Sequence, residues 1–196
     1  MKIGEARQIY STQIKEYQEQ KLLLSKQKRD LEKRIESTEN GKTLFAEEAA
    51  TLELTYDAVN KKQTEYQDYM NELTEQWAAK ANMVSAEQQG DAMKEYVEDL
   101  GKIMEVARRI MKGGIVPVTD EKKLMEFSME LYQSAKSIGA MIRNRDKEEY
   151  DSLWEEEEEK EYEDPMEAAD NTEALSEGPE IIDVAGTIEA VTPADS

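Results

Sequence analysis

The sequence contains few residues that could carry out covalent chemistry. It has neither Cys nor His among its 196 residues, which removes thiol nucleophiles, disulfides, thiolate and imidazole metal ligands and the commonest general base. Gly113 and Gly114, followed by Lys122, lack the spacing and the Ser/Thr ending of a phosphate-binding loop. A catalytic carboxylate needs burial or a charged neighbour in a cleft, and the helical periodicity places Asp and Glu on solvated faces. We therefore expect no catalytic residue, no cofactor, no metal ion and no small-molecule substrate.

The remaining chemistry is that of binding, and methionine is its first candidate. A Met-rich face is predicted between residues 93 and 141. Thioether side chains adapt to apolar partners of different shapes. Met125 and Met129 lie off the main apolar stripe, so our hypothesis is that they belong to an exposed partner-binding surface. The competing interpretation is that the methionines fill the core between two helices.

A basic strip is the second candidate. Lys26, Arg29 and Lys33 lie on the face of the first helix that points away from its apolar seam. Such a strip could bind nucleic acid, an anionic membrane or the acidic end of the same chain. A solvated face with local ion pairs explains the same pattern.

Aromatic residues in an acidic setting are the third candidate. Tyr150, Leu153 and Trp154 precede the run Glu155–Glu159. This composition suits docking onto a basic groove of a partner protein by coupled folding and binding. Alternatively, Leu153 and Trp154 fold back as the last turn of the preceding helix. Further on, a short apolar island at residues 181–188 could add a strand to a partner's sheet or be an inert spacer.

Two long helices must position these candidates. An apolar residue recurs at every seventh position from Ile3 to Leu31 and again, in the same phase, from Phe45 to Leu73. The companion position four residues later is apolar about half the time. A pattern sustained over so many heptads indicates a coiled coil.

The pair Asn40-Gly41 interrupts this pattern. Asn and Gly readily take left-handed backbone conformations, which end a helix. If the chain turns there, facing residues have numbers that sum to 80, and this pairs Leu24 with Tyr56. The competing interpretation is one unbroken helix that dimerises in parallel.

A second helical pair is predicted after the hairpin. Ser85–Gln88 resembles a capping box and Gly90-Asp91 offers another helix start; the helix then ends at Gly113-Gly114. Thr119 and Asp120 have N-cap chemistry and begin a fourth helix that extends to about residue 145. The predicted domains are therefore a coiled-coil helical hairpin at 1–84, a Met-rich helical pair at 85–145 and a tail at 146–196.

The charge is concentrated in the tail. The whole chain has a net charge of −20, of which residues 146–196, with 20 acids and two bases, carry −18. Because this tail lacks helical periodicity, we expect it to be acidic and largely disordered. Its charge argues against naked nucleic acid as a ligand. No apolar run approaches the length of a membrane span and no signal-peptide core follows Met1, so we expect a cytoplasmic protein without membrane insertion.

The sequence thus predicts an all-α protein: a long antiparallel coiled-coil hairpin, a shorter helical hairpin and a disordered acidic C-terminal tail. Its predicted function is that of a non-catalytic adaptor or scaffold that recruits a protein partner with a basic surface through its helical base and tail. In outline it resembles the stalk proteins of flagellar-type export machines and the arms of prefoldin-like chaperones. That resemblance implies the alternative of a holdase or export-type chaperone, and a nucleic-acid-associated coiled coil is a third hypothesis. Homo-oligomerisation stays open.

Overall fold

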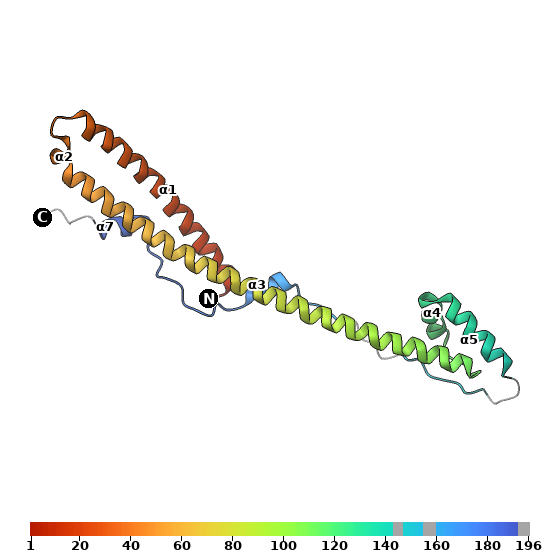
Figure 1. Ribbon diagram of the computed structural model, residues 1–196. Helices are drawn as coiled ribbons and strands as arrows, with labels where there is room; N and C mark the ends of the chain where they lie inside the picture. Colours follow the sequence, from red (N-terminus) through yellow and green to blue (C-terminus); the bar gives the residue numbers. More distant parts are fainter. Residues whose placement is uncertain (143–146, 155–159, 192–196) are drawn as a thin grey trace. The chain divides into compact units, whose positions relative to one another are not determined.

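The computed structural model describes residues 1–142, 147–154 and 160–191. The helices of these ranges, drawn in Figure 1, are α1 (Ile3–Ser37), α2 (Gly41–Leu44), α3 (Ala46–Met111), α4 (Val118–Phe127), α5 (Met129–Met141), α6 (Pro165–Asn171) and α7 (Val184–Glu189). Extended pairing in the described ranges is confined to two isolated bridges. The predicted all-α fold, a long hairpin followed by shorter helices, is confirmed.

The chain folds as two compact units. The first combines Met1–Val84 with Glu163–Ser196, and the second is Ser85–Tyr162. Helix α3 contributes residues to both. The tail is therefore shared between the units: its first part belongs to the second unit and its last part to the first.

The hairpin of the first unit turns at Asn40 and Gly41. Asn40 has a left-handed backbone (φ 58°, ψ 23°), and the Gly41 amide donates to the Thr38 carbonyl at 3.0 Å. The backbone of Gly41 lies so close to the Ile35 carbonyl that a side chain there would clash. The predicted turn is confirmed, and the chain doubles back instead of continuing as one helix.

The seam of the hairpin follows the predicted heptads. The buried residues of its core are Ile3, Ala6, Tyr10, Tyr17, Leu24, Val59, Tyr66, Tyr69 and Leu73. Facing pairs include Tyr17–Tyr66, Lys28–Tyr56 and Arg34–Phe45. The numbers of each pair sum to within four of the predicted 80, so the antiparallel pairing is confirmed and its register agrees with the prediction to about one helical turn.

Polar seam residues find partners across the hairpin. The Lys21 ammonium donates to the side-chain oxygens of Asn60, at 2.7 Å, and Gln63, at 2.9 Å. The Lys28 ammonium pairs with Glu53 and lies 4.8 Å from the centre of the Tyr56 ring. These contacts give the two ammonium groups polar partners, while the aliphatic parts of the lysine side chains pack on the seam.

The second unit is a small three-helix core. Its buried residues come from α3 (Val106, Ala107 and Ile110), the loop after it (Val116), α4 (Leu124) and α5 (Ala135). Ser128, in extended conformation, separates α4 from α5, and its hydroxyl accepts a hydrogen bond from the Leu131 amide at 3.1 Å. This contact is an N-cap for α5.

Two predicted helix boundaries are wrong. Helix α3 continues without a break through Ser85 and Gly90, because strong helix formers surround them and one internal glycine costs only about 1 kcal/mol. The predicted fourth helix instead stops at Phe127 and restarts at Met129, because the Ser128 side chain competes for backbone hydrogen bonds.

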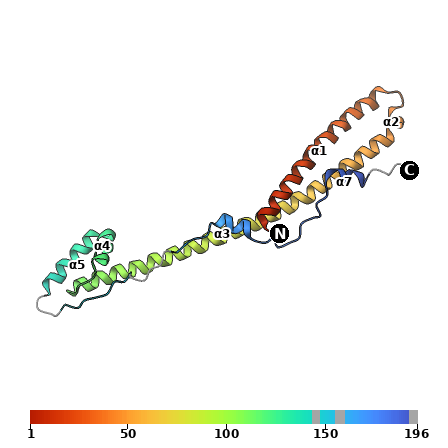
Figure 2. The ribbon, with the colours of Figure 1, turned by 180° about the vertical axis from the view of Figure 1, so that it is seen from behind.

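The described tail residues have little regular structure, but residues 164–191 are held on the hairpin. The Ile3 amide donates to the Thr172 carbonyl at 2.8 Å, and the Ala174 amide donates to the Met1 carbonyl at 3.1 Å. Figures 1 and 2 both show α7 beside the hairpin. Tail residues 146, 155–159 and 192–196 lie outside the described ranges.

Candidate functional site

Four tyrosines of the hairpin form the most highly organised site in the first unit. Tyr10 and Tyr17 come from α1, and Tyr66 and Tyr69 come from α3. The Tyr66 ring lies 5.5 Å from that of Tyr10 and 5.4 Å from that of Tyr17, while the Tyr10 and Tyr69 rings are 4.8 Å apart. Tilted and edge-to-face contacts of this kind stabilise aromatic clusters. We call these four residues the tyrosine clasp.

The hydroxyls of the clasp bind the backbone of the tail. The donor and acceptor pairs are Tyr69 to the Ser176 carbonyl at 2.9 Å, Tyr10 to the Pro179 carbonyl at 2.7 Å, and Tyr17 to the Ile182 carbonyl at 2.8 Å. A buried tyrosine hydroxyl needs a hydrogen-bond partner. The tail supplies these acceptors, so the buried aromatic seam and the bound tail depend on each other.

Tyr66 occupies the centre of this contact. Its hydroxyl accepts a hydrogen bond from the Ile182 amide at 2.8 Å and lies 3.0 Å from the Glu180 carbonyl oxygen. One side chain therefore satisfies both a donor and an acceptor of an extended backbone. Nearby, Ala174, Val184 and Ile188 pack against the hairpin core.

Gly178 is the tightest point of the contact. A Cβ atom there would clash with the Tyr10 hydroxyl and lie 2.5 Å from Cε1 of Tyr69. Only a residue without a side chain brings the tail backbone this close to two aromatic rings. Pro179 follows directly and offers its carbonyl to Tyr10.

Burial changes the acidity of the clasp. Removal from water raises the pKa of Tyr10, Tyr17 and Tyr69 above the ordinary value of 10, because the phenolate is poorly solvated there. All three hydroxyls remain protonated and able to donate at neutral pH.

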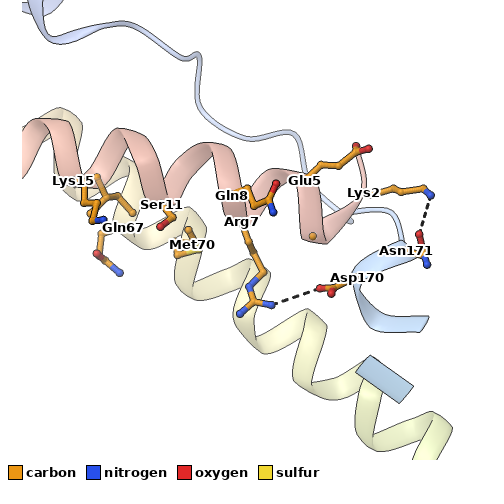
Figure 3. Close-up of a pocket in the computed structure, with 12 residues that line it drawn as sticks. Lys2, Glu5, Arg7, Gln8, Ser11, Lys15, Gln67, Met70, Asp170 and Asn171 are labelled. Carbon is orange, nitrogen blue, oxygen red and sulfur yellow. Dashed lines mark hydrogen bonds and ion pairs between the residues drawn. The ribbon is translucent and has the colours of Figure 1, made fainter. Parts of the chain in front are cut away.

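A hollow of about 840 Å³ lies where the start of α1 meets α6. Figure 3 shows that Lys2 and Arg7 reach toward α6: the Arg7 guanidinium lies 3.8 Å from Asp170, and the Lys2 ammonium donates to the Asn171 side chain at 2.9 Å. The Trp77 indole also donates to Asp170, at 2.8 Å. These polar contacts hold the tail on the hairpin.

In the second unit, Asp120 anchors another part of the tail. Its carboxylate is completely buried and accepts hydrogen bonds from the Ser152 hydroxyl, at 2.6 Å, and the Leu153 amide, at 3.0 Å. The sequence analysis expected Asp120 as an N-cap, but Pro117 holds that position. The carboxylate is therefore used for a long-range contact.

The aromatic residues proposed for partner binding pack within this unit. Tyr150, Leu153 and Trp154 lie half-buried against the core of α3, α4 and α5. The Trp154 indole donates to Asp99 at 2.7 Å, and the Arg109 guanidinium lies 4.5 Å from the centre of the Tyr150 ring. Leu153 and Trp154 thus pack back onto the core of the second unit, but they do not form a last turn of the preceding helix, which ends at Met141. The neighbouring Glu155–Glu159 lies outside the described residues.

The two methionines proposed for partner binding differ in exposure. Met125 is half-buried on α4, whereas Met129, at the start of α5, is 51 % exposed. The end of α5 exposes more apolar surface: Met141 is 79 % exposed, Ile138 45 % and Ile142 40 %. The structure therefore places the larger exposed apolar surface around Met141 at the end of α5, whereas our hypothesis singled out Met125 and Met129 within the predicted Met-rich face.

The basic strip on α1 is solvated. Lys26, Arg29 and Lys33 are all exposed. The Arg29 guanidinium donates to the Ser25 carbonyl at 3.3 Å, and the Lys33 ammonium lies 3.7 Å from Asp30. These local contacts are those expected of a solvated helix face.

The comparisons with known proteins give no family. No protein-family model matches the chain, and neither the curated proteins nor the solved structures include a significant match. None of the helices in the described ranges is long and apolar enough to cross a membrane. Within those ranges, no group of three or more acidic residues is arranged to hold a metal ion.

The tyrosine clasp is a binding site that the sequence patterns did not predict. The heptads placed Tyr10, Tyr17 and Tyr66 in the seam, but nothing assigned their hydroxyls a partner. A usable signal existed: tyrosines in a narrow seam need acceptors, and Gly178-Pro179 begins the apolar island of the tail. That island is bound by the hairpin, with Val184–Glu189 helical.

We predict that Gly178→Val releases the tail from the tyrosine clasp. The new side chain would displace the backbone from Tyr10 and Tyr69, which breaks the neighbouring hydrogen bonds. Limited proteolysis followed by mass spectrometry should show cleavage within residues 173–190 at least about tenfold faster than in the wild type, since cleavage follows the population of the open form.

Glu177→Val is the matched control, because Glu177 is an exposed neighbour. It should leave the cleavage rate close to that of the wild type. Equal rates for Gly178→Val and the wild type would mean that the close approach at Gly178 does not hold the tail.

The raised tyrosine pKa values predict a late alkaline transition. The protonated hydroxyl is favoured in the folded state, so its contribution to stability is complete below pH 10 and is lost as the pH rises through the raised values. Absorbance at 295 nm should show a late tyrosinate step that disappears in the variant Tyr10→Phe, Tyr17→Phe, Tyr69→Phe. If wild type and variant show no late step while circular dichroism reports a folded chain, this prediction is wrong.

Proposed function

We propose that the protein is a non-catalytic scaffold. In this proposal the hairpin, closed by the protein's own tail, is a spacer, and the second unit recruits a protein partner. The observation that supports recruitment is the apolar face at the end of α5, formed by Ile138, Met141 and Ile142. The cytoplasmic location expected from the sequence belongs to the same proposal.

This face has the properties of a docking surface. Ile138 and Met141 are spaced i, i+3 and lie on one side of α5, and Ile142 follows directly as its C-cap residue. Two of them are β-branched and rigid, while Met141 can adapt to the shape of a partner. Contiguous exposed apolar surface of this kind marks interaction sites in soluble proteins.

The role of the tail differs from the expectation of a free arm. Tyr150, Leu153 and Trp154 are packed on the second unit and Asp120 holds them there. A partner could bind them only by competing with these contacts. Met129 is exposed next to Ser128 and remains available as a second contact.

We predict that Ile138→Asp with Met141→Asp abolishes partner capture. A charge on each side of the face would have to be desolvated on binding, which is costly. The test is affinity capture with full-length wild type and variant, identification by mass spectrometry and pairwise binding of the purified candidate. The variant should weaken that purified complex by at least about tenfold.

The control carries the same two charges on the opposite side of α5, as Gln133→Asp with Ala140→Asp, since both positions are exposed. It should bind like the wild type. Equal binding by wild type and the Ile138/Met141 variant would contradict the proposal. Capture of many unrelated unfolded proteins, together with suppression of their aggregation, would instead support the holdase alternative.

A further inference from the structure

In the second unit, α3 exposes an apolar stripe. Met93, Val97, Leu100 and Met104 follow the spacing four, three, four, which is that of a coiled-coil seam. Met93 is 65 % exposed, Val97 59 % and Met104 51 %, while Leu100 is half-buried. Tyr96, beside this stripe, is 60 % exposed.

The opposite side of α3 carries polar residues, yet it is the side that the chain covers. Asp99 accepts a hydrogen bond from the Trp154 indole, and Glu95 pairs with the Lys160 ammonium at 2.5 Å. Figures 1 and 2 both show residues 147–154 and 160–162 alongside the part of α3 that belongs to the second unit. A helix in water normally buries its apolar side and exposes its polar side. Here the arrangement is reversed, which indicates that the apolar stripe has a partner.

Charge identifies that partner. Residues 85–98 contain four acids and one base, a net of −3, whereas residues 99–112 contain two acids and four bases, a net of +2. Two copies of this segment attract each other when they run antiparallel, because the acidic half of one then faces the basic half of the other. A parallel pair would place like charges together.

We propose that a second copy of the chain covers this stripe, with the two α3 segments antiparallel. In this register Val97 faces Leu100 of the second copy and Met93 faces Met104 of the second copy. Four apolar side chains from each copy form the seam. The contact is short, so we expect a weak dimer that is populated only at high protein concentration.

The first test compares the association of three full-length proteins by sedimentation equilibrium over a range of concentrations. The wild type should show a monomer–dimer equilibrium. Val97→Glu should raise the dissociation constant by at least about tenfold, because a carboxylate would be desolvated in the seam. Ala92→Glu, an exposed position away from the stripe, should match the wild type. A monomeric wild type, or a Val97→Glu protein that dimerises equally well, would overturn the proposal.

The second test determines the orientation. Since the chain has no cysteine, Met93→Cys and Met104→Cys each introduce a single thiol. Antiparallel pairing predicts that a mixture of the two variants forms a disulfide-linked heterodimer under mild oxidation, while each variant alone crosslinks poorly. Efficient crosslinking of each variant with itself would indicate parallel pairing and overturn the antiparallel register. Circular dichroism of both variants confirms that they fold.

Discussion

The hydrogen bonds from the tyrosine clasp to the tail backbone are the interaction on which the first unit depends. The seam is filled by Tyr10, Tyr17, Tyr66 and Tyr69. Their buried hydroxyls need hydrogen-bond partners, which the seam itself does not provide. Their acceptors come from residues more than one hundred positions away in the sequence. Without the tail, the hydroxyls and the surrounding apolar surface would be left to water. The hairpin and residues 173–188 therefore form one structural unit.

This interaction also explains how a very acidic segment can bind a nearly neutral body. The clasp contacts backbone carbonyls, one backbone amide and the Thr187 hydroxyl, so it does not need basic side chains opposite the tail acids. Glu177 and Glu180 stay exposed to water while the chain between them is held. Charge acts at the edges, where Arg7 lies near Asp170 and the Lys2 ammonium bonds to Asn171. The high negative charge of the tail is thus compatible with docking, because the tail acids in the described ranges remain exposed to water.

The sequence predicted the features that depend on local pattern. Heptads and the Asn40-Gly41 turn gave the hairpin and its register, since both follow from helical period and backbone preference. Periodicity did not reveal the continuity of α3 through Gly90 or the break at Ser128. Each is decided by a balance of about 1 kcal/mol that surrounding residues can reverse.

The candidate sites were harder to predict, because they join distant parts of the chain. Asp120 looked like a helix cap, but its carboxylate binds Ser152 and Leu153. The sequence indicated that Trp154 could take part in docking. It did not predict that the Trp154 indole donates a hydrogen bond to Asp99 on α3. Exposure of Met141 was equally hidden, since the spacing of an apolar residue does not say whether a neighbour covers it.

The most direct test of this account is amide hydrogen exchange at Ile182 in the intact wild-type chain near neutral pH. That amide donates to the Tyr66 hydroxyl, and it lies in a segment without helix or sheet bonds of its own. If the clasp holds the tail, Ile182 exchanges at least about one hundred times more slowly than in a free peptide of residues 173–191. Exchange at the rate of the free peptide would show that the tail is not bound and would contradict the account.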